Sequence, residues 1–209
     1  MKLGLAERET RGEPVAAQPP PRTLLIGYGA AGRALAARLA ERGALAGVVD
    51  PAVASSSAGG DVMDSPPPDL SHVDLVLAVT PASAAVDLAQ SLAYRAEQFL
   101  HVDLSSADAS QMAAAAGAFD SDRFVDGAIM GAVELHGADT PILLAGEAAA
   151  TAAKLMKATG LPAAALPDSN AGDASAVKLL RSVVTKGLEA VAVEAYVAAR
   201  RLGLEDALK

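Results

Sequence analysis

Three glycines follow a short apolar run with the spacing G-x-G-x-x-G: Gly27, Gly29 and Gly32. Gly27 permits a tight turn, Gly29 lets the backbone approach a pyrophosphate, and Gly32 lets a helix pack closely on a strand. A helix that opens near Ala30 would direct unpaired N–H groups and the positive end of its dipole at the phosphates. The sequence therefore predicts a phosphate-binding turn formed by Gly27, Tyr28, Gly29, Ala30, Ala31 and Gly32.

One acidic residue completes this pattern. Asp50 lies 18 residues beyond Gly32, at the end of a second apolar run, where a carboxylate accepts hydrogen bonds from ribose hydroxyls. It would repel the 2′-phosphate of NADP, and residues 51–60 contain no Lys or Arg to receive one. We therefore expect NAD as the cofactor, with NADP less favoured. A methyltransferase is the alternative, because that class also places an acid after a glycine turn but binds S-adenosylmethionine.

The elements around these groups alternate between strand and helix patterns. Apolar runs predict strands at 23–29, 44–50, 73–81, 99–106, 124–131 and 140–147, with a short strand near Val62, and helical patterns cover 33–43, 83–96, 109–119 and 151–160. This alternation predicts an α/β fold, a Rossmann-like doubly wound and mainly parallel sheet covered on both faces. Ligands gather at the carboxyl ends of strands in such sheets, where Thr80 and Pro81 lie. We expect these two residues to contact the cofactor, although they are also typical of a simple strand end.

Three regions follow from the same patterns. Residues 1–22 carry mixed charges and prolines and predict a disordered tail, and residues 23–168 form the dinucleotide-binding domain. Region 169–209 is dominated by a long helical pattern from Ala174 to Leu202, which would begin an all-α C-terminal domain that is truncated. Lys178 starts a polar stripe on this helix, and apolar residues occupy most other sides, so we expect the helix to be enclosed.

Composition limits the classes of function. The net charge is −8 and no basic run occurs, which argues against a nucleic-acid partner and favours a small-molecule substrate. No apolar run is long enough to cross a membrane, and no targeting signal is recognisable. The chain has no cysteine, which fits a cytoplasmic location and excludes thiolate metal sites. We expect no metal, and we interpret His101 and Asp103 as a packed, hydrogen-bonded pair because no third ligand is evident.

Three further segments resemble the β-hydroxyacid dehydrogenase and 6-phosphogluconate dehydrogenase-like superfamily, in particular its branch with a C-terminal domain of unknown function. HVDLSSAD carries the family's D-x-S pattern at Asp103 and Ser105, and VDGAIMGAVELHG lies where the family has its glycine-rich substrate loop. The segment from Asn170 to Gly203 resembles the family's central helix, with Gly172 six residues before Lys178. The likeness spans about Thr23 to Gly203.

The resemblance implies an NAD(P)-dependent oxidoreductase that transfers hydride between nicotinamide and a small β-hydroxy acid or a related substrate. It implies that Lys178 is the general acid/base, and that Ser105, Gly131 and Ser182 bind substrate. An ammonium group in an apolar pocket loses its proton more readily, which suits this role. A noncatalytic or degenerate NAD(P)-binding module is the alternative reading.

The chain also departs from the family pattern. Ser182 stands where the family usually has Asn, and Met130 stands where the substrate loop usually has Ser, which puts the identity of the substrate in doubt. Arg181 or Lys186 would then hold the substrate's acidic group. Because the long helix carries apolar residues around most of its circumference, we expect a homodimer that pairs through this helix.

Overall fold

The computed structural model describes residues 19–54, 61–95 and 97–208. Most of the tail expected at residues 1–22, namely residues 1–18, lies outside the described residues. Across the described part of the chain one eight-stranded sheet forms the centre of the fold, in the order β3-β2-β1-β4-β5-β6-β7-β8. The strands are β1 (Thr23–Ile26), β2 (Leu45–Val49), β3 (Val62–Met63), β4 (Leu75–Ala78), β5 (Leu100–Asp103), β6 (Phe124–Ile129), β7 (Ile142–Ala145) and β8 (Ala163–Ala165).

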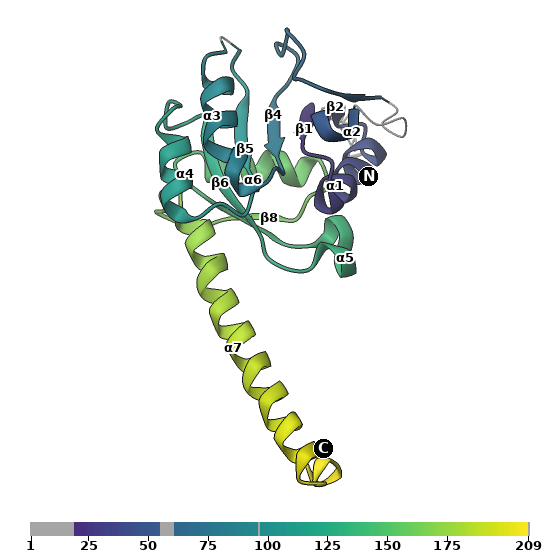
Figure 1. Cartoon of the computed structure of the whole chain (residues 1–209). Coiled ribbons are helices and arrows are strands. Elements are labelled where there is room, and N and C mark those ends of the chain that lie inside the picture. The colour runs from purple at the N-terminus through teal and green to yellow at the C-terminus, as the bar shows by residue number, and fades with distance from the viewer. Residues whose placement is uncertain (1–18, 55–60, 96, 209) are drawn as a thin grey trace, which may run out of the picture.

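Helices connect these strands and cover both faces of the sheet (Figure 1). The α-helices are α1 (Ala30–Glu41), α2 (Pro51–Ala54), α3 (Ala85–Ala93), α4 (Ala109–Ala116), α5 (Val133–His136), α6 (Ala149–Ala158) and α7 (Asp173–Arg201). Short 3-10 turns are η1 (Ala82–Ala84), η2 (Gly137–Asp139) and η3 (Glu205–Ala207). The Rossmann-like, mainly parallel sheet followed by one long helix is confirmed.

The sheet is buried because successive side chains of its strands alternate between two apolar layers. Leu25 of β1 packs with α1 and α6 on one face, whereas Leu24 and Ile26 pack with α3 on the other. All of these β1 side chains are 5% exposed or less. The continuous apolar run of β1 is therefore what a parallel strand covered on both sides requires.

The direction of the last two strands was not predicted. Strands β1 to β6 are parallel, but β7 runs antiparallel to β6, and β8 pairs parallel with β7. The connection from β6 to β7 holds only the short α5 and η2. Strand β8 was missed because its three alanines carry no strand signal.

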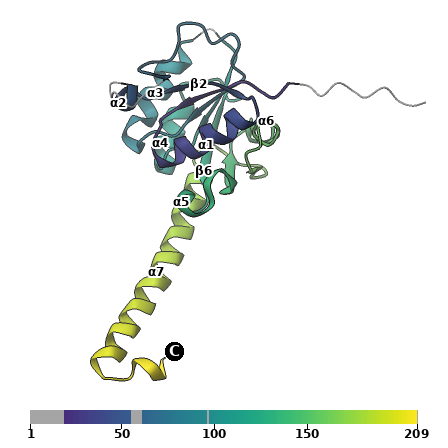
Figure 2. The same ribbon diagram turned by 90° about the vertical axis from the view of Figure 1, so that its right-hand side faces the viewer.

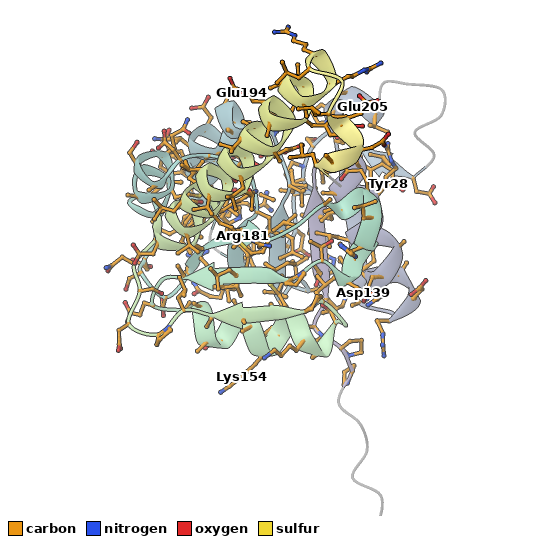
Figure 3. All side chains as sticks on the ribbon, turned by 90° about the horizontal axis from the view of Figure 1, so that it is seen from below. Tyr28, Asp139, Lys154, Arg181, Glu194 and Glu205 are labelled. Atoms are coloured by element: carbon orange, nitrogen blue, oxygen red, sulfur yellow. The ribbon has the colours of Figure 1, made fainter. Side chains whose placement is uncertain are left out.

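Helix α7 leaves the sheet domain as a long rod (Figures 1 and 2). Its first turn packs on β6, β7 and α4, where Ala174 and Ser175 are buried. Beyond this turn the large apolar side chains are open, with Leu180, Val184 and Leu188 exposed by 68%, 61% and 68%. Seen from below, Glu194 lies in the part of the chain that extends beyond the sheet domain (Figure 3). The expectation that this helix is enclosed on most sides is therefore wrong for the single chain, because the large apolar side chains beyond its first turn are exposed.

No helix of the described residues combines the length and the apolar character that a membrane span requires.

Candidate functional site

The glycine turn connects β1 to α1, and each glycine has its own steric reason. Gly27 has φ +102°, and a Cβ there would collide with the carbonyl oxygen of Val79. A Cβ on Gly32 would collide with the carbonyl oxygen of Gly27, so this glycine lets α1 start directly against the turn. A Cβ on Gly29 would meet nothing within 4 Å, because it would project into open space. Gly27 and Gly32 are thus required by the fold, whereas Gly29 leaves room for a ligand.

The N-terminus of α1 faces this space. Gly29 is the N-cap residue, no side chain caps the helix, and the first turn contains no acidic residue. The first N–H groups of a helix have no partner within it, and the helix dipole places partial positive charge there. This end of α1 can therefore accept an anion such as a diphosphate.

Asp50 directly follows β2 and holds the neighbouring turns together. One carboxylate oxygen accepts a 2.8 Å hydrogen bond from the Tyr28 amide, and the other accepts one of 2.9 Å from the Ala52 amide. The oxygen bonded to Tyr28 has one further acceptor position, because a carboxylate oxygen carries two lone pairs. Asp50 thus supports the glycine turn and can still accept a hydrogen bond from a hydroxyl group.

A cavity of about 550 Å³ lies between these groups and β4. We call it the glycine-turn cavity, and its lining includes Gly27, Gly29, Ala30, Ala31, Gly32, Asp50, Thr80 and Pro81. Tyr28 is the one residue of the predicted turn that does not line it; its amide holds Asp50 instead. The cavity sits at the carboxyl ends of β1 and β4, where the strand order reverses, which is the usual ligand position in doubly wound sheets.

A second and a third cavity continue from the first toward α7. The central cavity, about 230 Å³, shares Ala31, Val79 and Thr80 with the glycine-turn cavity. The α7 cavity, about 220 Å³, shares Ile129, Gly131 and Lys178 with the central cavity. The three cavities therefore lie in a row along the carboxyl edge of the sheet. Thr80 stands at the first junction, and its buried hydroxyl oxygen has no hydrogen-bond partner among the described residues.

Lys178 stands at the second junction. Its Nζ donates a 3.2 Å hydrogen bond to the Ser106 hydroxyl, in the loop after β5. Burial lowers the pKa of Lys178, and the negative charge of Asp126 opposes this effect in part. The structure thus brings the residue that the sequence singled out to a place between two cavities, with its proton held less tightly than on a solvated lysine.

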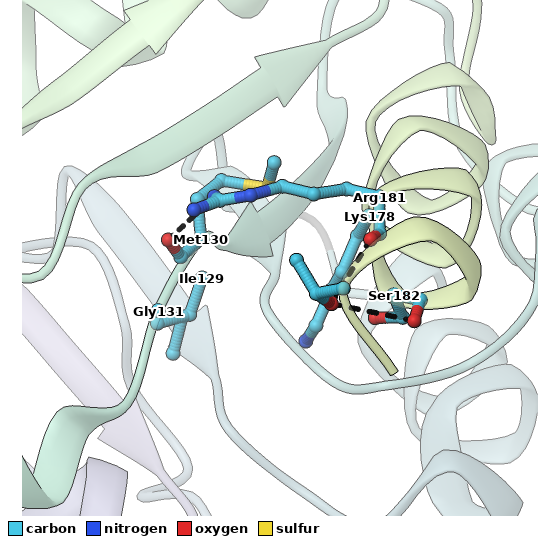
Figure 4. A pocket seen from close by; sticks show the side chains of 7 residues that line it. Ile129, Met130, Gly131, Lys178, Arg181 and Ser182 are labelled. Atoms are coloured by element: carbon cyan, nitrogen blue, oxygen red, sulfur yellow. Dashed lines mark hydrogen bonds between the residues drawn. The ribbon is translucent and has the colours of Figure 1, made fainter. Parts of the chain in front are cut away.

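Polar and positive groups of α7 line the α7 cavity (Figure 4). Arg181 Nη1 donates a 2.8 Å hydrogen bond to the Met130 carbonyl oxygen, which links α7 to the end of β6. Ser182 and Thr185 lie on the same side of the helix, and no acidic side chain lines this cavity. Two cations and no carboxylate in the lining of this cavity favour an anionic ligand there.

The other predicted substrate residues fall into two groups. Gly131 lines both the central and the α7 cavity, and Ser182 lines the latter. Ser105 lines the central cavity but is 3% exposed, and its hydroxyl oxygen accepts a 3.3 Å hydrogen bond from the Ala107 amide. Its neighbour Ser106 is the one that contacts Lys178, a contact that sequence reasoning did not assign.

The expected hydrogen bond between His101 and Asp103 is absent. Nε2 of the imidazole lies 3.9 Å from the carboxylate Oδ2, and neither atom has a hydrogen-bond partner. The imidazole instead stacks on the Phe119 ring at 5.4 Å between centroids, and burial lowers its pKa to about 3. His101 is therefore a neutral core residue. Within the described residues no group of three or more His, Asp or Glu side chains could hold a metal ion.

Asp126 received no role from the sequence, yet it binds the start of α7. Its carboxylate accepts hydrogen bonds from the Gly172 amide and from the amide and hydroxyl of Ser175. A signal was present, because an acid inside the apolar strand FVDGAI must find partners when buried.

Comparison with known proteins gives both relatives and fold neighbours. No family model matches the chain. An uncharacterized 28.5 kDa protein of Methanothermus fervidus is 32% identical over 136 residues, which are 65% of this chain and 51% of that protein. The chain thus spans about half the length of the curated relative that it matches.

Two solved structures define the resemblance more closely. MTH1747, a conserved protein of unknown function with structural similarity to 3-hydroxyacid dehydrogenases, is 30% identical with a TM-score of 0.73; the match covers 90% of this chain and 73% of that one. The 3-hydroxyisobutyrate dehydrogenase of Mycobacterium tuberculosis shares the fold, with a TM-score of 0.74, 21% identity, and coverage of 88% and 67%. The chain belongs to the 3-hydroxyacid dehydrogenase-like family of NAD(P)-binding proteins.

Proposed function

We propose that the chain is an NAD(P)-dependent oxidoreductase that transfers hydride between nicotinamide and a small hydroxy acid, with Lys178 as general acid/base. The observation that carries the proposal is the row of cavities between the N-terminus of α1 and Lys178. A dinucleotide has a diphosphate in the middle and a reactive ring at one end, so it fits a site with an anion-binding helix end at one place and a proton-transfer group further on.

The glycine-turn cavity has the features that a dinucleotide needs. Because Gly29 has no Cβ, the space beside it stays open, and the amides at the start of α1 can donate hydrogen bonds to a diphosphate there. Asp50 would accept a hydrogen bond from a ribose hydroxyl and would repel a 2′-phosphate, which favours NAD over NADP. Thr80 and Pro81 would contact the part of the dinucleotide that continues toward the central cavity.

Lys178 performs the proton transfer in this proposal. When bound, nicotinamide supplies the chemistry of hydride transfer. The unprotonated amine takes the proton from the substrate hydroxyl during oxidation, and the ammonium returns it to the carbonyl oxygen during reduction. Burial favours the first state by lowering the pKa of Lys178, and Ser106 holds the amine in place.

The α7 cavity would hold the substrate's acidic group. Arg181 uses one N–H for the Met130 carbonyl oxygen and retains further donors, since a guanidinium group carries five. Ser182 supplies a hydroxyl where a longer amide is usual in the family, and Gly131 lets main-chain atoms approach the ligand. The small volume of about 220 Å³ fits a substrate of a few carbon atoms. The fold neighbour from M. tuberculosis was solved with L-serine, a hydroxy acid of this size.

A second copy of the chain would cover α7. The exposed apolar side chains on this helix include Leu180, Val184, Leu188 and Val191. In this proposal α7 begins the helical C-terminal region and supplies the dimer interface. Sedimentation at micromolar concentration should give a dimer; a stable monomer would contradict the pairing.

The proposal is tested with a panel of small hydroxy acids and NAD or NADP, followed by absorbance of the reduced nicotinamide. Turnover should be found with at least one hydroxy acid, and Lys178→Ala should abolish it while NAD binding is retained. Binding of NAD without any turnover would favour the noncatalytic module. Binding of S-adenosylmethionine instead of NAD would favour a methyltransferase and contradict the proposal.

A further inference from the structure

Asp126 lies in the middle of β6 and is completely buried. Three donors at the start of α7 surround its carboxylate, although they lie 46 to 49 residues further along the chain. Oδ2 accepts hydrogen bonds of 2.9 Å from the Gly172 amide and 3.0 Å from the Ser175 amide, and Oδ1 accepts one of 2.7 Å from the Ser175 hydroxyl. We call this set of contacts the Asp126 clamp.

The clamp supplies the N-terminal cap that α7 itself lacks. The N-cap residue of α7 is Gly172, and it has no side chain that could accept from the first turn. Its φ of +105° and the 2.7 Å that would separate a Cβ from the Ala109 carbonyl oxygen explain why a glycine stands there. Asp126, which belongs to β6, therefore caps the first turn of α7, and its negative charge lies at the positive end of the α7 dipole.

The clamp holds α7 one turn before Lys178. Ser175 and Lys178 are three residues apart, so their side chains lie on the same face of α7. Past the first turn α7 is held mainly by Lys178 itself and by Arg181, which bonds the Met130 carbonyl oxygen one turn further on. Because the rest of α7 is exposed, few other contacts fix how the helix is rotated about its axis, or shifted along it, at Lys178.

We propose that Asp126 is a positioning residue: its contacts with Gly172 and Ser175 hold the Lys178 amine at the junction of the central and α7 cavities. This inference rests on the proposed function for the role of Lys178. Asp126 does not contact the substrate in this arrangement, since it lines none of the three cavities.

Asp126 also acts on Lys178 through its charge. Ser106 after β5 accepts the hydrogen bond of the amine, and Glu134 of α5 and Arg181 on the next turn of α7 line the same cavities as Lys178. The charge of the buried Asp126 also reaches the amine. Asp126 raises the pKa of Lys178 against the larger effect of burial. Removing this negative charge should therefore lower the pKa of Lys178, and the oxidation rate, which requires the unprotonated amine, should rise at a lower pH.

The test compares Asp126→Asn and Ser175→Ala with Asp74→Asn in the full chain. Asp74 also accepts a backbone hydrogen bond, 2.7 Å from the Arg22 amide, but it lies just before β4, whereas Lys178 lines a cavity with Val79 and Thr80 at the other end of this strand. Four quantities are measured: kcat, the dissociation constant of NAD, the pKa of Lys178 by NMR, and amide exchange at the start of α7.

For Asp126→Asn we expect faster amide exchange at Gly172 and Ser175, a lower pKa of Lys178 and a kcat reduced on the order of tenfold to a hundredfold, with NAD affinity unchanged. Ser175→Ala removes only the hydroxyl bond and should lower kcat less, without shifting the pKa. Asp74→Asn should change none of these four quantities. If Asp126→Asn does not fold, Ser175→Ala carries the test through kcat and amide exchange.

The inference is overturned if Asp126→Asn leaves kcat and the pKa of Lys178 as in the wild type, or if kcat and NAD affinity fall together. Absence of turnover in the wild-type protein would count against the proposed function alone. The clamp would then still be judged by amide exchange and by the pKa of Lys178.

Discussion

Replacing Gly29 by alanine separates ligand binding from folding. The backbone at Gly29 has φ −70° and ψ −162°, which alanine adopts without strain, and its Cβ would meet no atom within 4 Å. Alanine is a poorer N-cap than glycine, by about 0.5–1 kcal/mol. For a chain of this size that corresponds to a decrease in Tm of at most about 4 °C. The protein should therefore fold almost normally.

The same methyl group would stand where the diphosphate has to approach α1. Hydrogen bonds to a charged group contribute about 1.5–3 kcal/mol each. The loss of one such bond weakens binding by roughly tenfold to 150-fold. Calorimetric titration with NADH measures this change, and thermal unfolding measured by circular dichroism gives the Tm.

Gly32→Ala is the contrasting variant. Its Cβ would collide with the Gly27 carbonyl oxygen, which belongs to the backbone of the turn, so Tm should fall by much more than in Gly29→Ala. If Gly29→Ala binds NADH as tightly as the wild type, the diphosphate does not approach α1 at Gly29. If Gly29→Ala unfolds as readily as Gly32→Ala, Gly29 is required by the fold and not only by the ligand.

Three further changes test other parts of the site and the core. Lys178→Met should lower turnover by about a hundredfold or more and leave the dissociation constant of NADH unchanged in titrations, whereas a parallel loss of binding would contradict its role. Asp50→Ala should weaken NAD binding and narrow the preference for NAD over NADP, which competition between the two dinucleotides measures. His101 has a folded-state pKa of about 3, below its usual 6.5. The imidazole therefore binds a proton more tightly in the unfolded chain than in the folded one, and the free energy of unfolding should fall as the pH drops from 6.5 toward 3. Over this pH range the free energy of unfolding should decrease by roughly 5 kcal/mol. His101→Phe, which keeps the stacking on Phe119, should lose less stability in urea unfolding over this range; equal losses would show that His101 does not cause the acid sensitivity.

The sequence was most informative where local chemistry determines local structure. Gly27 and Gly32 are required by the turn itself, and Asp50 accepts a hydrogen bond from its backbone, so the turn could be predicted without knowing the rest of the fold. The mainly parallel sheet followed from the alternation of strand and helix patterns. The reversal of β7 did not, because the apolar pattern within a strand does not show whether it runs parallel or antiparallel to its neighbour.

Contacts between distant residues were harder to predict. The hydrogen bond between Asp126 and Ser175 joins a strand to a helix 49 residues later, and neither residue lies in a motif that indicates the other as its partner. The pairing of Lys178 with Ser106 spans 72 residues and depends on where α7 leaves the sheet. The apolar circumference of α7 suggested enclosure, but side-chain types alone do not say whether the cover comes from the same chain or from a partner.

The most direct test of the account is a crystal structure of the protein grown with NAD. We expect the diphosphate against the amides at the start of α1, a ribose hydroxyl bonded to Asp50, and the nicotinamide ring in the central cavity next to Lys178. A dinucleotide bound elsewhere, or a nicotinamide ring out of reach of the Lys178 amine, would contradict it.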